Sequence, residues 1–241
     1  MTDIHCHILP GLDDGSQTLA DSVAMARMAC AGGVEAIVAT PHCNHPARGE
    51  NYISEELTES FTALEAALRE QNIPLLLFSG AEVLCTPETP ELLRQKKLPT
   101  IANTDYLLVE FYFDETLEYM DSMLAALRAE GVKPVIAHPE RYFAAQEDKE
   151  HIGLWFDRGY ILQMNKGSIL GHLGREACLT AQWMLDNGAV HICASDAHGV
   201  NARTPNLAVM RDYFEENFSH RCAEILLYEN PWHLVHGEPM A

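Results

Sequence analysis

The stretch Glu35-Ala36-Ile37-Val38-Ala39-Thr40-Pro41-His42 joins an apolar run to a histidine just beyond its end. A continuous apolar run of this length is typical of a strand that is buried on both faces, as in a parallel sheet. The same order, an apolar run followed by a side chain that could bind a metal, recurs along the chain. This recurrence predicts that separate strands deliver side chains to one common rim.

Seven strands of this kind are predicted, and helical patterns lie between most of them. The strands are Asp3–His7, Glu35–Thr40, Leu75–Gly80, Tyr106–Phe111, Val132–Ala137, Tyr160–Asn165 and Val190–Ala194. The helices are one capped by Ser54, a short one at Pro90–Gln95, one from Thr116 to Gly131, and further ones at Lys149–Arg158, Gly174–Asn187 and Asn206–Asn217. The segment Cys43–Glu50 is expected to be a loop. Alternation of this kind predicts an α/β fold with a parallel sheet and crossover helices, in one domain over residues 1–241.

Length and charge narrow the class of protein. The 241 residues suffice for one large domain but fall slightly short of a full eight-unit barrel of about 250 residues. The formal net charge of −19 and the lack of any Lys/Arg run argue against nucleic-acid binding. Because this charge repels anions, an anion site must be positive locally, and bound divalent cations would make it so.

The N-terminus and the cysteines indicate a cytoplasmic protein. Met1-Thr2-Asp3-Ile4-His5 has neither the basic nor the apolar region of a secretory signal, and no apolar stretch of about 18 residues is present to insert in a membrane. The seven cysteines are odd in number and form no Cys-x-x-Cys pair. We therefore expect reduced thiols.

Candidate metal ligands follow the predicted strands one after another. His5 and His7 are two apart on a strand, so both side chains are expected on one face, where they could chelate one ion. Any one of the others could be a helix cap or a surface residue, but a ligand type at six or seven strand ends is not expected by chance. Carboxylates can also bridge two ions. The ligands that follow later strands are His42, Glu82, Glu110, His138, Asp196 and His198.

Two further features carry open alternatives. Asp13 and Asp14 precede Gly15, and since Asp-Gly is a strong turn pair, one aspartate could shape the turn while the other binds metal. The residues themselves do not decide which. Arg141 and Arg203 lie close to ligand clusters, and a guanidinium can hold two oxygens of a phosphoryl group. The alternative for both arginines is a surface salt bridge.

Two other kinds of phosphate chemistry are disfavoured. Cys43 is separated from Arg48 by four residues, whereas the cysteine-phosphatase loop needs five, and Gly49 stands at the required position. No Gly-x-x-x-x-Gly-Lys-Ser/Thr sequence is present to cradle a nucleotide.

The motif series resembles the polymerase and histidinol phosphatase (PHP) superfamily. It comprises Asp-Ile-His-x-His, Asp-Asp-Gly, Thr-x-His, Gly-Ala-Glu, Glu-Phe, Ala-His-x-Glu-Arg-Tyr and Ala-Ser-Asp-x-His followed by Arg-x-Pro. The His-Pro-Glu-Arg-Tyr and Ser-Asp-x-His pieces are similar to those of the bacterial metal-dependent protein-tyrosine phosphatases of capsular and extracellular polysaccharide synthesis. The match runs from Asp3 to about Pro205.

The resemblance implies a distorted (β/α)7 TIM-like barrel and three divalent ions, with manganese expected and iron or zinc as alternatives. By motif, His5, His7, Glu82 and Asp196 hold one ion, and Glu82, Glu110 and His138 hold a second, with Glu82 bridging. Asp14, His42 and His198 hold the third, so the resemblance selects Asp14 over Asp13. Arg141 and Arg203 bind the phosphate.

The implied activity is removal of phosphate from protein phosphotyrosine by a metal-activated hydroxide. Arg141, Arg203, Asp196 and His198 are the predicted catalytic residues, and either Asp196 or His198 could donate a proton to the leaving group. A bacterial tyrosine autokinase tail is the expected protein substrate, and regulation of polysaccharide synthesis the expected role.

Three alternatives stay open. The nearest is a histidinol-phosphate phosphatase with the same barrel and metals. The second is an amidohydrolase, which would often need a bridging lysine, and Lys166 is the only lysine at a strand end that could serve. The third is a barrel that binds partners without catalysis.

Overall fold

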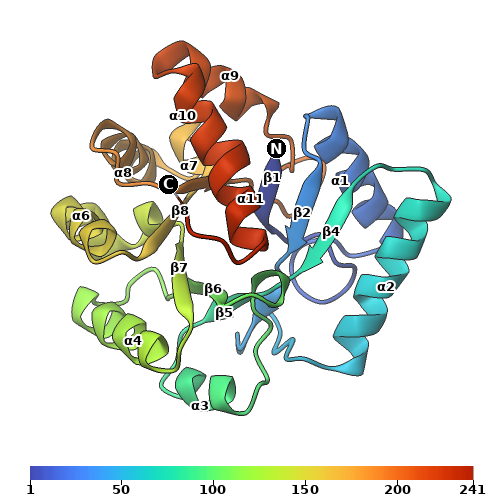
Figure 1. Ribbon diagram of the computed structural model, residues 1–241, viewed down its shortest axis with the longest axis horizontal. Coiled ribbons are helices and arrows are strands. Elements are labelled where there is room, and N and C mark those ends of the chain that lie inside the picture. Colours follow the sequence, from blue (N-terminus) through green and yellow to red (C-terminus); the bar gives the residue numbers. More distant parts are fainter. Residues whose placement is uncertain (241) are drawn as a thin grey trace.

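The computed structural model describes residues 1–240 and places the strands at the centre of a ring of helices (Figure 1). All the paired strands run parallel, and their bounds are β1 (Thr2–Cys6), β2 (Ala36–Ala39), β3 (His42–Cys43), β4 (Leu76–Ser79), β5 (Glu82–Leu84), β6 (Tyr106–Glu110), β7 (Lys133–Ala137), β8 (Ile161–Asn165) and β9 (Ile192–Ala194).

The strands fall into two sheets that continue one another. One has the order β1-β2-β4 and the other β3-β5-β6-β7-β8-β9. Only Thr40-Pro41 separates β2 from β3, and only Gly80-Ala81 separates β4 from β5. Two of the predicted strands are thus followed by short second strands that were not predicted, one after Pro41, which has no backbone N–H to donate, and one after Gly80. The predicted loop Cys43–Glu50 loses Cys43 to β3.

Backbone contacts join the last strand to the first. A parallel bridge links Cys6 to Ala197, just after β9, and His7 N donates to Ala197 O at 2.9 Å. Asp196 N donates to His5 O at 2.9 Å. The strand series therefore returns to its beginning, and the prediction of a distorted (β/α)7 arrangement is confirmed.

Most helices surround the strands, whereas α11 (Asn230–Val235) lies over the middle of the ring (Figure 1). The other helices are α1 (Leu19–Ala31), α2 (Glu55–Glu70), α3 (Thr89–Arg94), α4 (Leu117–Ala129), α5 (Phe143–Glu147), α6 (Lys149–Asp157), α7 (Lys166–Ile169), α8 (Arg175–Asp186), α9 (Ala208–Asn217) and α10 (His220–Glu224). Short 3₁₀ turns at Ile101–Asn103 and Pro139–Arg141 and a π-helical turn at Ile225–Glu229 complete the series. The six predicted helices are present with ends within about two residues of those expected.

Helix α1 was not predicted. Its start carries a capping box, in which the Thr18 side chain accepts from Asp21 N and Asp21 Oδ2 accepts from Thr18 N. Its buried residues include Ser22, Ala26 and Ala29, which are small or polar, so the helix lacks a clear apolar stripe. The capping box was therefore the one clear sequence signal for this helix.

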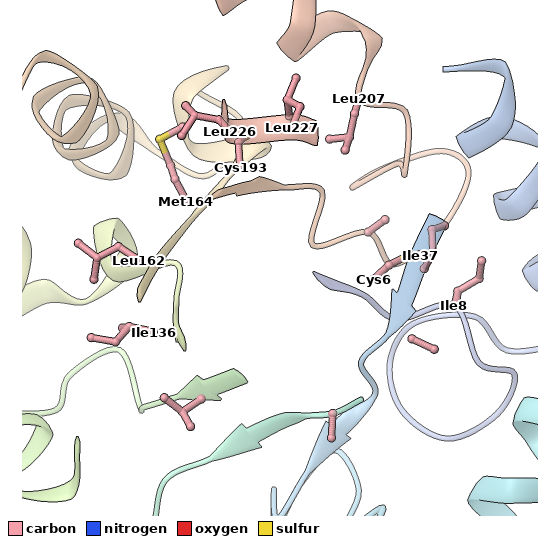
Figure 2. Packing of buried hydrophobic residues seen from close by; sticks show 14 of the residues in the cluster. Cys6, Ile8, Ile37, Ile136, Leu162, Met164, Cys193, Leu207, Leu226 and Leu227 are labelled. Atoms are coloured by element: carbon pink, nitrogen blue, oxygen red, sulfur yellow. The ribbon is translucent and has the colours of Figure 1, made fainter. Parts of the chain in front are cut away.

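Two apolar layers hold the strands in place. The inner layer contains Ile4, Val38, Leu108 and Val135 from the strands, and α11 contributes Leu234 and Val235 to it. The outer layer lies between strands and helices, and Figure 2 shows part of it, including Met164, Cys193, Leu226 and Leu227. Fully burying one Leu or Ile side chain contributes about 1.5–3 kcal/mol, so these layers fix the strand ends that carry the site.

No helix among residues 1–240 combines the length and apolar character needed to cross a bilayer.

Candidate metal centre

The predicted ligands come together where the strands end. They form three groups whose candidate ligand atoms lie within 4.8 Å of one another: His5, His7, Glu82 and Asp196; His42, Glu82 and Glu110; and His7, Asp14, His42 and His198. Each pair of groups shares one residue, namely Glu82, His7 or His42. The sequence had predicted only Glu82 as a shared ligand.

The first group is fully buried. His5 Nε2 lies 3.3 Å from His7 Nε2, 3.2 Å from Glu82 Oε1 and 3.5 Å from Asp196 Oδ1. His7 lies beyond the end of β1, yet its Nε2 is 3.3 Å from Glu82 Oε2 and 3.5 Å from Asp196 Oδ1. Two imidazole nitrogens and two carboxylates thus face one point, which is a donor set suited to a divalent ion.

The second group differs in part from the expected set. His42 Nδ1 lies 2.8 Å from Glu110 Oε1 and 3.1 Å from Glu82 Oε2. His138, which was expected here, lies 2.7 Å from the other oxygen of Glu82 through Nε2. It is buried beside the group but is not one of its three members.

The third group distinguishes the two aspartates. Asp14 Oδ1 lies 3.4 Å from both His42 Nε2 and His198 Nε2, and its side chain is 46% exposed. The Asp13 side chain is buried, lies 2.7 Å from His7 Nδ1 through Oδ2, and accepts from Gly15 N at 2.9 Å. Asp13 therefore shapes the turn and orients His7, while Asp14 faces the third group.

Histidines of the cluster fall into two electrostatic classes. Burial lowers the pKa of His138 and of His198 to about 4, so both are neutral near pH 7 and offer a lone pair. Burial also lowers the pKa of His42, but Glu82, Asp14 and Glu110 outweigh it and raise that pKa to about 9. Excess negative charge around His42 is the condition that favours a bound cation.

The carboxylates differ in a similar way. Burial raises the pKa of Asp196, but His5 and Arg203 outweigh it, and the pKa lies well below its ordinary value. Glu110 is different, because burial and the neighbouring Glu82 carboxylate raise its pKa. Two carboxylates held this close without full neutralisation are stabilised by a cation between them.

Two polar atoms in the cluster test whether a metal fits. Among the described residues, His198 Nε2 and Asp196 Oδ1 are buried. His198 Nε2 has no hydrogen-bond partner, and Asp196 Oδ1 has Arg203 as its ion-pair partner. A buried polar atom without such a partner costs about 1–3 kcal/mol. Both atoms belong to groups of His, Asp and Glu donors, so these residues suit a divalent metal ion.

The predicted phosphate arginines lie at the outer edge of the cluster. Arg141 Nη1 donates to Asp196 Oδ2 at 3.3 Å, and its guanidinium stacks 4.4 Å above the Phe113 ring. Arg203 Nη2 forms an ion pair with Asp196 Oδ1, and Arg203 Nε donates to Asp196 O at 3.2 Å. Their side chains are 19% and 29% exposed, so neither is a free surface salt bridge. Beside Asp196 and Arg203 opens a cavity of about 660 Å³.

Backbone strain marks the same positions. His138, Asp196 and Arg203 have φ values of 37°, 49° and 47°, in the left-handed region that few non-glycine residues adopt. Such residues cost of the order of 1–3 kcal/mol each and cluster at functional sites.

Sequence reasoning missed part of the surroundings of the cluster. Gln163 and Asn165 of β8 are fully buried and bond to His5 and Asp196, and Arg48 Nη1 lies 2.8 Å from His42 Nε2. A glutamine and an asparagine two apart in a buried strand were the available signal, because buried amides need partners.

Lys166 does not reach the cluster. Its Nζ donates to the backbone oxygens of Thr204 and Asn206, the latter at 2.9 Å. The bridging lysine that an amidohydrolase would often need is therefore not provided here.

Comparison with known proteins agrees with this geometry. The family model described as "Capsular polysaccharide synthesis, CpsB/CapC" matches residues 1–236. Tyrosine-protein phosphatase YwqE of Bacillus subtilis (strain 168) is 35% identical over 205 residues, which cover 84% of this chain and 79% of YwqE. Tyrosine-protein phosphatase CpsB of Streptococcus pneumoniae is 29% identical, over 98% of each chain.

Solved structures extend the comparison to the fold. One match comes from a study of YwqE from Bacillus subtilis and CpsB from Streptococcus pneumoniae, described as unique metal-dependent tyrosine phosphatases. It has a TM-score of 0.92 at 32% identity, and covers 100% of this chain and 96% of its own. A lactonase from Listeria monocytogenes, with a TM-score of 0.63 at 11% identity over 99% of this chain and 95% of its own, shares the fold alone. By the family match over residues 1–236 and the identity to YwqE, the chain belongs to the CpsB/CapC family of capsular polysaccharide synthesis.

Proposed function

We propose that this chain is a metal-dependent protein-tyrosine phosphatase that hydrolyses phosphotyrosine on a protein of capsular or extracellular polysaccharide synthesis. The observation that carries the proposal is the meeting of three overlapping ligand groups with two partly buried arginines at one rim. The names of the relatives support the substrate, because YwqE and CpsB are tyrosine-protein phosphatases.

The proposed ligands are the nine residues singled out in the sequence. His5, His7, Glu82 and Asp196 hold one divalent ion, Glu82 and Glu110 a second, and Asp14, His42 and His198 a third, with His138 beside Glu82. His7 and His42 join two groups each, which extends the expected sets. We propose manganese, with iron or zinc as alternatives, since donors of this kind accept all three. When bound, such ions lower the pKa of water toward about 7 and neutralise charge on the phosphoryl group.

The chain's own residues bind and orient the phosphate. Arg141 and Arg203 reach Asp196 from two sides, so their guanidinium groups bracket the position next to the proposed ions. A phosphate dianion bound there replaces part of each arginine's contact with Asp196. The cavity of about 660 Å³ beside Arg203 leaves room for the substrate near these groups.

The leaving tyrosine depends less on a proton donor than an alkyl alcohol would. Phenol leaves with a pKa of about 10, lower than that of an alkyl alcohol. Asp196 pairs with two arginines and its pKa is held low, so it stays ionised and does not donate the proton. His198, with a pKa of about 4, is neutral near pH 7 and is itself a proposed ligand, so solvent is left for that role. Asp196 acts as a ligand and as the partner of the arginines.

The proposed setting is the cytoplasm, with the tail of a bacterial tyrosine autokinase as substrate. All seven cysteines of the chain are free, which supports a reducing compartment. The relatives support a phosphoprotein substrate over histidinol phosphate, and the autokinase tail is the finer part of this proposal.

One experiment tests the proposal directly. Purified protein, stripped of metal and reloaded with Mn²⁺, is assayed against phosphotyrosine peptides and histidinol phosphate side by side. We expect turnover of the peptides, dependence on added metal, and little turnover of histidinol phosphate. Preferential hydrolysis of histidinol phosphate would show that the small amine phosphate is the substrate.

A further inference from the structure

Strand β8 contributes no proposed ligand, yet two fully buried amides project from it into the polar cluster. Gln163 Oε1 lies 2.8 Å from His5 Nδ1, and Gln163 Nε2 donates to Asn165 Oδ1 at 2.8 Å. Asn165 Nδ2 then donates to Asp196 Oδ2 at 2.6 Å. Three hydrogen bonds thus connect His5 with Asp196, which are two members of the same group.

The ionised state of Asp196 determines which atom donates and which accepts in every hydrogen bond of this series. Asp196 is paired with two arginines, so it is an ionised carboxylate that only accepts hydrogen bonds. Asn165 must therefore turn its NH₂ toward Asp196 and its oxygen toward Gln163. Gln163 must in turn donate to Asn165 and present its own oxygen to His5. His5 can satisfy that oxygen only by carrying a proton on Nδ1.

Asn165 is itself held by a second buried carboxylate. Glu140 Oε1 accepts from Asn165 N at 2.9 Å and from Ser168 Oγ at 2.6 Å. These contacts fix the backbone at the end of β8, from which the Asn165 side chain reaches Asp196.

The atoms that the series uses are not the atoms that face the group. The hydrogen bonds of the series engage His5 Nδ1 and Asp196 Oδ2. The other atoms of the two side chains, His5 Nε2 and Asp196 Oδ1, lie 3.5 Å apart and face the same point. In known metal sites, partners of this kind orient the ligands, and their loss typically costs 10–100-fold in metal affinity or activity.

We propose that Gln163 and Asn165 are positioning residues that form a directional amide relay between His5 and Asp196, fixing the Nδ1–H form of His5 and aiming both ligands at one ion. This inference rests on the proposed function, because it takes His5 and Asp196 as ligands of the same metal. It assigns a role to β8, the strand between β7 and β9, which contributes no proposed ligand.

The test combines metal affinity with a spectroscopic signature. Zn²⁺ is the probe, because it is diamagnetic and suits this donor set. The Kd for Zn²⁺ is measured by competition titration for the wild type, Gln163→Met and Asn165→Asp. Thr180→Val is the matched control, since Thr180 is buried on α8, away from the relay, with a hydroxyl that has no hydrogen-bond partner among the described residues. The His5 ring is followed by ¹⁵N–¹H NMR of Zn²⁺-loaded protein and assigned by comparison with His5→Gln.

We expect a His5 Nδ1–H proton protected from exchange in the wild type and in Thr180→Val. In Gln163→Met that signal exchanges rapidly, and the Kd for Zn²⁺ rises about 10–100-fold. Asn165→Asp, which cannot donate to Asp196, raises the Kd at least as much. The relay would be overturned, whatever the variants do, if His5 Nδ1–H exchanged rapidly in the wild type or if His5 bound the metal through Nδ1. Unchanged Zn²⁺ affinity in the folded variants would overturn it as well.

Different results would contradict the relay and the proposed function. If the protein binds Zn²⁺ with the expected Nδ1–H signal but does not hydrolyse phosphotyrosine after loading with Mn²⁺, the proposed function is wrong and the relay stands. If the wild type binds neither metal, both are overturned.

Discussion

Arg141 Nη1 lies 3.3 Å from Asp196 Oδ2, so a proposed phosphate-binding group is paired with a proposed metal ligand. Truncation of Arg141 leaves the ligand set intact and removes a cation that faces the phosphoryl group. We predict that Arg141→Ala lowers kcat by about 10²–10³-fold. Metal content, measured by elemental analysis, is expected to stay near that of the wild type.

Arg158→Ala is the matched control for that variant. Arg158 is half-exposed and pairs with Asp121, away from the cluster. Its loss should leave kcat within about two-fold of wild type, because exposed ion pairs contribute about 0–1 kcal/mol. Unchanged turnover in Arg141→Ala would contradict the proposed phosphate-binding role of Arg141.

Glu82 belongs to two of the ligand groups, whereas Glu110 belongs to one. We predict that Glu82→Gln lowers the bound metal by at least two ions and abolishes turnover, because a neutral amide is a poor bridge between cations. Glu110→Gln should lose one ion. Metal-to-protein ratios after gel filtration measure both, and a full complement in Glu82→Gln would contradict the bridge.

Chelation of metal should abolish activity, whereas alkylation of thiols should leave activity almost unchanged. Cys43, next to His42, is buried, and burial raises the pKa of its thiol to about 12, so it is not a thiolate near pH 7. We predict that EDTA abolishes hydrolysis of p-nitrophenyl phosphate, that Mn²⁺ restores it, and that iodoacetamide leaves it almost unchanged. Activity that survives EDTA but not iodoacetamide would indicate cysteine chemistry.

Gly15 closes the turn that carries Asp14, and a Cβ there would lie 2.3 Å from His7 O and 2.4 Å from His7 Cβ. We predict that Gly15→Ala costs about 1–3 kcal/mol of unfolding free energy and weakens Mn²⁺ binding, since the turn must move away from His7. Gly153→Ala in α6, whose Cβ would meet only Trp183 at 3.6 Å, should do neither. Denaturant melts and metal titrations compare the two, and equal Mn²⁺ affinity would show that the turn tolerates a side chain.

His191 supplies a pH test outside the metal centre. Burial lowers its pKa from 6.5 to about 4, its Nδ1 accepts from Leu162 N at 3.1 Å, and its ring stacks on Phe156. Since the unfolded chain takes up the proton first, the contribution of His191 to stability falls as pH drops from about 6.5 to 4 and then levels off. The difference approaches about 3 kcal/mol at low pH.

The variant His191→Asn should lack this part of the pH dependence. Urea melts of metal-free wild type and variant at pH 7 and pH 4.5 measure it, and the wild type should lose more stability between those pH values. An equal loss in both proteins would show that His191 takes up its proton in the folded state.

The strand ends were readable from the sequence because each joins a buried apolar run to a polar side chain. Both features are present in Ala36–Ala39, which precedes His42, and in Tyr106–Glu110, which ends on the proposed ligand Glu110. Helix α1 lacked a clear stripe, because alanine and serine occupy much of its buried face. Two features depend on three-dimensional register that residue spacing does not carry. They are the pairing of β3 with β5 beyond Pro41 and the second ligand group, which has His42 where His138 was expected.

Helix α11 and the Gln163–Asn165 pair show a different limit. Asn230–Val235 is short, and its packing against Ile4 and Val38 joins residues almost the whole chain apart. The spacing of Gln163 and Asn165 indicates two buried amides that need partners, but only the structure shows that the partners are His5 and Asp196. Local pattern predicts which elements exist, whereas partners distant in sequence decide which polar residues matter.

The three ligand groups share Glu82, His7 and His42 pairwise, so no group is a separate unit. An ion bound in one group would orient a residue of each neighbouring group before a second ion binds. Loading should therefore be cooperative, with occupancy rising steeply over a narrow range of free metal concentration. A protein built in this way would switch between empty and loaded forms over a small change in free metal concentration.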